Sequence, residues 1–196
     1  AALSGYSALL LGCGLGRAAG TSEMVSRLLL SGAELPPTVV DADGLNLLSE
    51  ATDWHKRFLA PAIVTPHAGE MSRLTGSVAL PQGAERIEQA RRAAYEWDKT
   101  VVLKGAYTVV ADPDDRAMVS PFANPALATA GTGDVLAGVI VGLLAQGVPL
   151  FEAAALGVFL HGSAGEIVRS QMGEAGVIAG DLLPELPPAI KSLAES

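Results

Sequence analysis

The stretch NPALATAGTGDVLAGVIVGLLAQG, residues 124–147, contains two glycines around a threonine, then one aspartate and then an almost unbroken apolar run. The run is too short to cross a bilayer, so it predicts a buried helix whose first turn holds Asp134. Gly138 and Gly142 lie four residues apart on this helix and suggest close packing against another element. A carboxylate is costly to bury at the mouth of so apolar a segment, which suggests that Asp134 has a function.

Short apolar runs alternate with helical patterns along the rest of the chain. Three segments predict a strand that opens into a turn, and a helix follows the second and third: SALLLGCGLG (7–16), PPTVVDADGLNLL (36–48) and PAIVTPHAGEMSRLTG (61–76). GAERIEQARRAAYEWD (83–98) predicts an amphipathic helix, and TVVLKG with YTVVAD predicts a hairpin or two closely spaced strands.

A second long helix is expected from Leu150 to Met172, after a boundary marked by Gly147 and Pro149. Strands that alternate with helices predict an α/β layered fold with a mostly parallel central sheet flanked by helices. In such sheets ligands bind outside the carboxyl ends of the strands.

The composition is that of a globular protein without a basic surface. The chain has 196 residues, 49% of them hydrophobic, and we expect residues 1–196 to form a single domain. The formal net charge of −8 argues against binding to nucleic acid or to an anionic membrane. The single cysteine, Cys13, excludes an intramolecular disulfide, and no signal-peptide pattern is present, so a cytoplasmic location is expected.

Gly131, Thr132 and Gly133 precede Asp134 at the predicted start of the helix. Glycines let the backbone approach a ligand closely, and the first amides of a helix have no intrahelical partner. With the helix dipole, these amides predict an anion hole for a transferring phosphoryl group or an oxyanion. Asp134 can then take a proton from a hydroxyl that attacks phosphorus. The alternative is that Asp134 is an N-cap or first-turn residue that only stabilises the helix, a contribution of about 1 kcal/mol.

Two further turns carry ionisable side chains. Lys104 ends a strand before Gly105, where it can meet a phosphate; the alternative is an ordinary hairpin with a solvated lysine. His67 can hydrogen-bond to a ligand. Glu70 can hold a metal-bound water or simply occupy the first turn of a helix, where a negative charge suits the dipole.

The remaining polar candidates give weaker signals. GCGLG (12–16) lacks the last glycine of a dinucleotide fingerprint and is either a ligand-binding loop or a plain tight turn. Asp41 and Asp43 either bind Mg²⁺ through water or form an Asx turn and cap the next helix. His161 lies in an apolar helix and is expected to be a satisfied core or interface residue. Three scattered histidines disfavour a zinc site, so no protein metal ligand is assigned.

Taken in order along the chain, five segments resemble the motifs of the ADP/ATP-dependent NAD(P)H-hydrate dehydratases of the ribokinase-like superfamily. They are GCGLG, DADGLNLL, TPHAGEMSRLTG, VVLKGAYTVV and the stretch 124–147, of which the last is the most specific. GVIAGDLLPELP (176–187) resembles the end of that domain, so the resemblance covers nearly the whole chain. It implies a ribokinase-like fold.

The resemblance also implies roles for single residues. Asp134 resembles the catalytic base, and Asp134, His67 and Gly14 resemble contacts to the hydrated nicotinamide dinucleotide. Gly133 resembles a contact to the phosphates of the adenine nucleotide. Residues 104–108 resemble the segment that binds this nucleotide; they are Lys104, Gly105, Ala106, Tyr107 and Thr108.

The family's reaction removes water from hydrated NADH or NADPH. A phosphoryl group from ADP or ATP activates the hydroxyl, with Mg²⁺ assisting, and loss of phosphate restores the ring. The expected partners are therefore the NAD(P)H hydrate and an adenine nucleotide, and a homo-oligomer is expected. Two alternatives stay open: a small-molecule kinase of the same superfamily acting on a thiazole or pyrimidine alcohol, and a non-catalytic nucleotide-binding subunit.

The sequence departs from the family pattern in two places. Cys13 stands where the family more often has proline. The family domain normally has a further N-terminal stretch before the glycine loop, which supplies strands and an alanine contact to the substrate. We therefore expect the N-terminal part of the domain to be missing from this chain.

Overall fold

The short apolar runs of the sequence form the strands of one sheet. The computed structural model describes residues 3, 5–77 and 82–195. Six strands follow one another in the order β1-β2-β3-β4-β5-β6, with β1 to β4 parallel and β5 and β6 added antiparallel. The predicted mostly parallel sheet is confirmed. The strands are β1 (Leu9–Leu11), β2 (Thr38–Val40), β3 (Ala62–Val64), β4 (Thr100–Leu103), β5 (Val109–Ala111) and β6 (Ala117–Val119).

Both faces of the sheet are buried, because successive side chains of a strand point to opposite sides. Val39, Ile63 and Val102 pack in one apolar cluster with side chains from α6 and α7. Their neighbours Val40 and Val101 pack in a second cluster with side chains from α1 to α5. Two-sided burial is typical of parallel sheets and explains why these strands are apolar throughout, without alternation.

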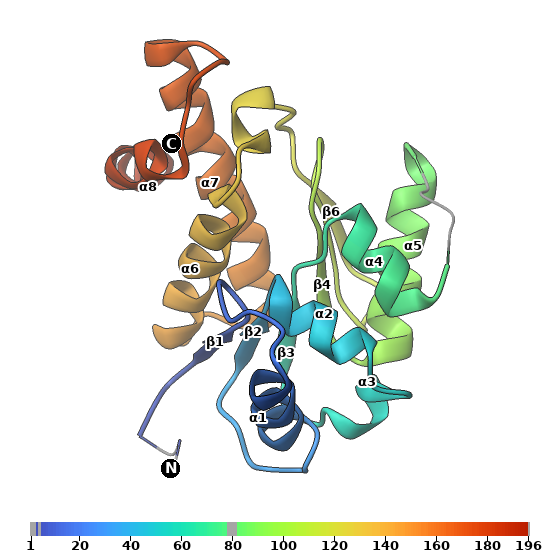
Figure 1. Cartoon of the computed structure of the whole chain (residues 1–196). Helices are drawn as coiled ribbons and strands as arrows, with labels where there is room; N and C mark the ends of the chain where they lie inside the picture. The colour runs from blue at the N-terminus through green and yellow to red at the C-terminus, as the bar shows by residue number, and fades with distance from the viewer. Residues whose placement is uncertain (1–2, 4, 78–81, 196) are drawn as a thin grey trace.

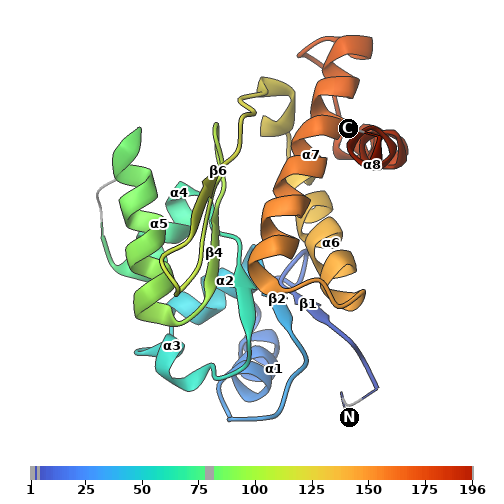
Figure 2. The same ribbon diagram turned by 180° about the vertical axis from the view of Figure 1, so that it is seen from behind.

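Helices cover the two faces of the sheet as separate layers (Figures 1 and 2). One layer contains α1 (Ala19–Leu29), α2 (Asp43–Ser49), α3 (Trp54–Arg57), α4 (Ala68–Thr75) and α5 (Ala84–Trp97). The other contains α6 (Thr132–Ala145) and α7 (Leu150–Met172), and η1 (Pro125–Ala128), η2 (Ala179–Glu185) and α8 (Leu186–Ala194) pack against α7. None of the described helices is long and apolar enough to span a membrane.

The close packing of α6 and the last strand of the sheet differ from what the sequence indicated. Gly138 and Gly142 are exposed, and no described atom lies within 4 Å of a Cβ built on either, so the predicted close packing at these positions is wrong. The close approach of α6 and α7 is instead at Gly157, where a Cβ would lie 2.5 Å from Cγ1 of Ile140. Strand β6 was not predicted, because its side chains are exposed or half-exposed and give no apolar signal.

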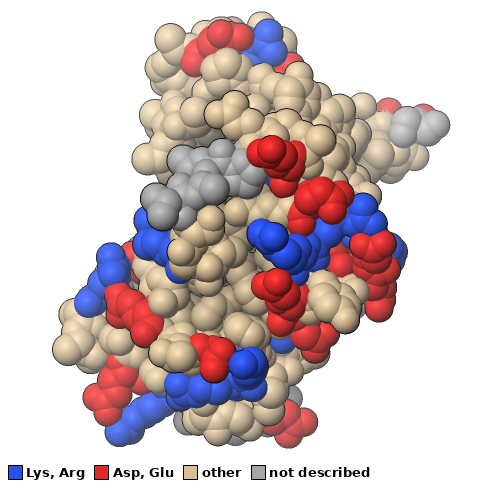
Figure 3. All heavy atoms as spheres, turned by 90° about the vertical axis from the view of Figure 1, so that its right-hand side faces the viewer, with Lys and Arg blue, Asp and Glu red and all other residues tan. Residues whose placement is uncertain are grey.

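Charged side chains of both signs lie on the surface over α4 and α5. On the side of the molecule that carries α4 and α5, acidic and basic side chains are interspersed (Figure 3). This face has the character expected from a chain with 21 acidic and 13 basic residues.

Candidate active site

The carboxyl ends of the parallel strands converge on one cleft. β1 is followed by the loop at Cys13, β2 by Asp41, β3 by His67 and β4 by Lys104. The N-terminus of α6 approaches from the other layer. The cleft between them has a volume of about 710 Å³ and is lined by residues that include Asp41, His67, Lys104 and Asp134. This is the edge at which open α/β sheets bind ligands.

A buried ion pair forms the base of the cleft. Nζ of Lys104 lies 2.5 Å from Oδ1 of Asp41 and 3.9 Å from Oε2 of Glu70. The side chains of Asp41 and Glu70 are 1% and 5% exposed, and that of Lys104 is 17% exposed. The alternative of a solvated lysine is therefore wrong. Lys104 offsets part of the cost of holding two carboxylates out of water, and Nε2 of His67 lies 3.4 Å from Oε1 of Glu70.

His67 caps helix α4. Its Nδ1 accepts hydrogen bonds from the amides of Gly69 at 3.0 Å and Glu70 at 3.3 Å, and the Glu70 carboxylate accepts one from the His67 amide at 2.8 Å. This reciprocal capping box fixes Glu70 in the first turn, as one of the two interpretations of the sequence expected. The His67 side chain remains 54% exposed and lines the cleft.

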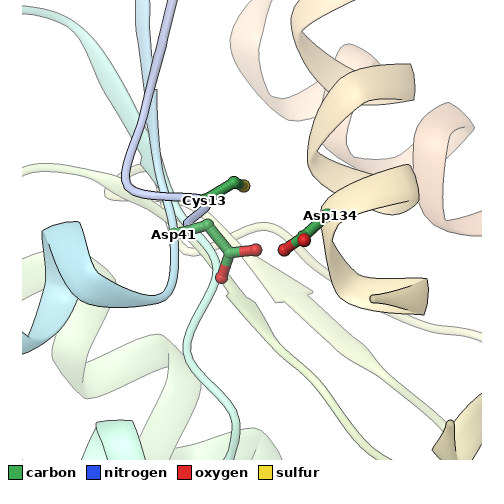
Figure 4. A group of neighbouring side chains, drawn as sticks. All are labelled: Cys13, Asp41 and Asp134. Carbon is green, nitrogen blue, oxygen red and sulfur yellow. The ribbon is translucent and has the colours of Figure 1, made fainter. Parts of the chain in front are cut away.

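Asp134 does not cap α6. The N-cap residue is Gly131, in the left-handed region at φ 89°, and no side chain caps this end of the helix. The N-cap alternative is therefore wrong, whereas the alternative position in the first turn of the helix is confirmed. The Asp134 carboxylate instead points across the cleft toward Asp41 and Cys13 (Figure 4), and ligand atoms of the three residues lie within 4.8 Å of one another. Asp134 is exposed, so the expectation of a buried charge is also wrong, and its carboxylate is open to a substrate.

The backbone before Asp134 offers open donors to the cleft. Among the described residues, no acceptor pairs with the amides of Gly131, Gly133 or Asp134. The amide of Thr132 differs, because it donates to the Thr129 carbonyl at 3.3 Å, and the Thr132 hydroxyl donates to the Leu127 carbonyl at 2.7 Å. Thr132 therefore shapes the turn, and the predicted anion hole is reduced to its two glycines and the Asp134 amide.

His161 on α7 supports this turn from within the fold. Its Nε2 lies 2.9 Å from the carbonyl oxygen of Thr132, which can only accept, so Nε2 carries the proton and donates. Burial lowers the pKa of His161 to about 4; the bond to Thr132 opposes this and the charge of Lys104 adds to it. The ring is therefore neutral at pH 7. The expectation of a satisfied core histidine is confirmed.

The loop after β1 brings Cys13 next to both aspartates. Burial raises the pKa of the Cys13 thiol to about 12, and the negative charges of Asp41 and Asp134 add to this. Gly12 makes the approach possible, because it has φ 133° and a Cβ there would lie 1.7 Å from the carbonyl oxygen of Asp41. Hard cations such as Mg²⁺ prefer oxygen to sulfur ligands, so the carboxylate oxygens of Asp41 and Asp134 are the donors that this group offers to such an ion.

Comparisons with known proteins agree with this geometry. The sequence model of the NAD(P)H-hydrate dehydratase family matches residues 1–188. The chain belongs to this family. It is 44% identical to the bifunctional NAD(P)H-hydrate repair enzyme of Moorella thermoacetica over 98% of the chain and 36% of that enzyme. The chain spans about a third of the length of the first curated relatives it matches.

Solved structures of relatives have the same fold. The ADP/ATP-dependent NAD(P)H-hydrate dehydratase of Bacillus subtilis, co-crystallized with ATP/Mg²⁺ and soaked with CoA, superposes with a TM-score of 0.81 at 33% identity, covering 95% of this chain and 66% of that one. A ribokinase-like superfamily protein of Enterococcus faecalis superposes with a TM-score of 0.78 at 26% identity, covering 97% of this chain and 64% of that one. The expected ribokinase-like fold is confirmed.

In this member of the NAD(P)H-hydrate dehydratase family, most residues predicted for the site lie in the cleft. Those that line it are His67, Lys104, Gly105, Ala106, Thr108, Gly131, Thr132, Gly133 and Asp134. Gly14 and Tyr107 are exposed, with φ 66° and 55°, and lie outside its lining. The roles of all these residues in binding and catalysis stay predictions.

The pairing of Asp41 with Lys104 is the main feature of the dehydratase-family site that sequence reasoning missed. The two residues lie 63 positions apart, so no local pattern connects them. Their shared position at carboxyl ends of strands was the available signal. Asp43, which the sequence grouped with Asp41, accepts a hydrogen bond from the Gly16 amide at 2.8 Å. Neither aspartate caps α2, whose N-cap is Ala42, so that alternative is wrong.

Proposed function

We propose that this chain carries the ADP- or ATP-dependent dehydration of hydrated NADH or NADPH. The observation that carries the proposal is the position of the Asp134 carboxylate. It does not cap the helix, it is open to the cleft, and it is adjacent to the free amides of Gly133 and Asp134. Family membership and the kinship with an ADP/ATP-dependent enzyme support it.

The arrangement provides for transfer of a phosphoryl group to a substrate hydroxyl. Asp134 accepts the proton of the hydroxyl as its oxygen attacks the terminal phosphorus of the nucleotide, and the nucleotide leaves with one phosphate fewer. The amides of Gly131 and Gly133 donate to the transferring phosphoryl oxygens, where negative charge is highest. Lys104 lies beside this position, because its Nζ is 3.4 Å from where a Cβ of Gly133 would be.

The second half of the reaction is an elimination. The hydroxyl has become a phosphate ester, and the carbon–oxygen bond breaks as inorganic phosphate leaves with both electrons. Loss of a proton from the adjacent ring carbon then restores the double bond of the reduced nicotinamide. Water is removed overall, and the nucleotide loses its terminal phosphate.

A magnesium ion fits the residues of this cleft. Asp41 and Asp134 offer carboxylate oxygens, the donors that Mg²⁺ prefers to the sulfur of Cys13. These two aspartates would hold the ion, and it would neutralise phosphate charge of the nucleotide. Residues 104–108 and Gly133 are the proposed nucleotide contacts, and Gly14, His67 and Asp134 the proposed contacts to the hydrate.

The test is turnover of hydrated NADH with ADP or ATP, followed by the return of the absorbance band of reduced nicotinamide. Asp134→Asn should reduce the rate about 10²–10⁴-fold, the usual contribution of a general base, and the affinity for ADP measured without Mg²⁺ should stay close to that of wild type. Asp114→Asn is the matched control, because Asp114 is exposed and lies outside the cleft. An unchanged rate in Asp134→Asn would exclude its role as the base.

The same assay separates the alternatives. A stable phosphorylated alcohol with no return of absorbance would identify a kinase. Nucleotide binding without any turnover would identify a non-catalytic subunit. One domain over residues 1–196, a cytoplasmic location and a homo-oligomeric state belong to the same proposal and rest on the sequence.

A further inference from the structure

Arg86, in the first turn of α5, binds the back of the segment that follows β4. Its Nη1 donates to the carbonyl oxygen of Ala106 at 2.6 Å, and its Nη2 donates to the carbonyls of Leu103 at 3.1 Å and Lys104 at 3.3 Å. One guanidinium therefore holds three carbonyl oxygens within a stretch of four residues. The fork geometry of arginine makes this possible, and a lysine ammonium cannot reproduce it.

Gly105 lets the guanidinium lie directly against the peptide backbone. A Cβ at this position would lie 2.9 Å from Nη2 of Arg86, and the residue has φ 148°, in the region that favours glycine. Arginine and glycine thus form one packed unit. A side chain at position 105 would push the guanidinium away and would also be strained by the backbone conformation.

The charge of Arg86 has no carboxylate partner in the described part of the chain, where the arginine pairs involve Arg17, Arg27, Arg91, Arg116 and Arg169 instead. The guanidinium is half-buried, and burial lowers its pKa from the usual value. Partial burial removes some of the water around this cation, and in the described structure only backbone carbonyls replace that water. Such an arrangement costs folding free energy, which suggests that the backbone geometry it imposes has a function.

The same segment also lines the cleft. Lys104, Gly105, Ala106 and Thr108 contribute to its wall, whereas Arg86 lies outside that lining. Further hydrogen bonds complete the shape: the Gly105 amide donates to the Thr108 hydroxyl at 3.3 Å and the Tyr107 amide donates to the Phe122 carbonyl at 2.9 Å. Arg86 therefore contacts the backbone of the nucleotide segment and does not itself line the cleft.

We propose that Arg86 is a positioning residue that holds segment 104–108 in its nucleotide-binding shape. The inference rests on the proposed function, because it takes this segment as the nucleotide site. Without Arg86, three carbonyls lose their donor, and a segment centred on glycine relaxes into other conformations. The nucleotide then has to order the segment on binding, and affinity falls because preorganisation is lost.

The test compares wild type with Arg86→Met, Arg86→Lys and Arg91→Met by calorimetric titration with ADP and with ATP. Arg91→Met is the matched control, because Arg91 lies on the same helix and pairs with Asp115 away from the cleft. We expect Arg86→Met to raise Kd for either nucleotide about tenfold, equivalent to about 1.4 kcal/mol. Arg86→Lys should lie between it and wild type, and Arg91→Met should bind as wild type does.

Two further readouts separate positioning from general stability. Hydrogen exchange of the Gly105 and Tyr107 amides should accelerate in Arg86→Met while exchange in the β1–β3 core stays unchanged. In turnover, KM for the nucleotide should rise about tenfold, and KM for the hydrate should stay as in wild type.

Several results would overturn the inference. One is an unchanged Kd in Arg86→Met; another is a parallel rise in both KM values together with faster exchange throughout the core. If Arg86→Met does not fold, wild-type affinity in Arg86→Lys would also refute it. A wild-type chain that binds nucleotide but does not dehydrate the hydrate would refute the proposed function. The role of Arg86 would then still be tested by the Kd of Arg86→Met relative to that of wild type. A wild-type chain that binds no nucleotide would refute both.

Discussion

Replacement of Lys104 by methionine tests whether the buried pair with Asp41 stabilises the fold as well as the site. Met keeps most of the side-chain length but removes the ammonium, so Asp41 and Glu70, 1% and 5% exposed, lose their cation. Breaking one side of a buried ion pair costs roughly 3–5 kcal/mol. Because the Lys104 side chain is 17% exposed, water reaches the gap, and we expect the lower end, about 3 kcal/mol.

The assay is urea unfolding followed by tryptophan fluorescence. Trp54 and Trp97 are both buried with ring centroids 5.1 Å apart, so their emission reports loss of the core. For a chain of this size, about 3 kcal/mol corresponds to a fall in Tm of roughly 6–12 °C. Nucleotide Kd should rise in the same variant, because Lys104 lies beside the anion hole.

The double variant Asp41→Asn/Lys104→Met decides whether the cost comes from the unpaired carboxylate. Removing both charges should restore more than half of the lost stability, because asparagine is neutral and cheaper to bury. Two results would refute the reasoning: a loss below about 1 kcal/mol in Lys104→Met, or a double variant no more stable than this single variant.

Three further perturbations follow from the structure. Gly12→Ala should lower the free energy of unfolding in urea by about 3 kcal/mol or more, because the new Cβ would collide with the Asp41 carbonyl. In the control Gly14→Ala the new Cβ meets no described atom within 4 Å, so the loss should be only about 1 kcal/mol, the cost of its left-handed backbone. Burial lowers the pKa of Lys99 in the folded protein below its usual value of 10.5. Between these two pKa values the unfolded chain binds more protons than the folded one, so the free energy of unfolding should rise as pH increases toward 10.5. Lys99→Met should remove this rise when unfolding is measured as a function of pH. Burial lowers the pKa of His161 from 6.5 to about 4, so stability should fall by roughly 3 kcal/mol as pH drops through that window, and the fall should be absent in His161→Gln.

The local signals of the sequence were sufficient for most of the elements. The sequence correctly predicted strands β1 to β5 and helices α2 and α4 to α7. Apolar patterning and boundaries at glycine or proline indicate these elements, and both are local properties of the chain. α1, α3, α8 and β6 were missed, as were the short 3₁₀ helices η1 and η2. The α1 segment AGTSEMVSRLL buries only Val25 and Leu29, and β6 buries no side chain completely, so packing against neighbours decides their conformation.

The chemistry of single site residues depended more on distant neighbours. The sequence placed Asp134 in the first turn of a helix after two glycines, but it could not distinguish a cap from a base. That choice depends on where the carboxylate points, and Asp41 and Cys13, which lie opposite, come from segments about a hundred residues away in the chain. For His67 the sequence suggested a ligand contact, and the structure adds its role as the cap of α4.

The sequence by itself determined the family, the α/β class, the order of the main elements and the motif that carries Asp134. Each of these is written in residues that are close together in the chain. Only the tertiary structure decided that Asp41, Glu70 and Lys104 share one buried cluster, that Asp134 is exposed to the cleft and that Gly138 and Gly142 face outward. Charge burial and side-chain direction depend on which elements pack together, and that packing is a property of the whole fold.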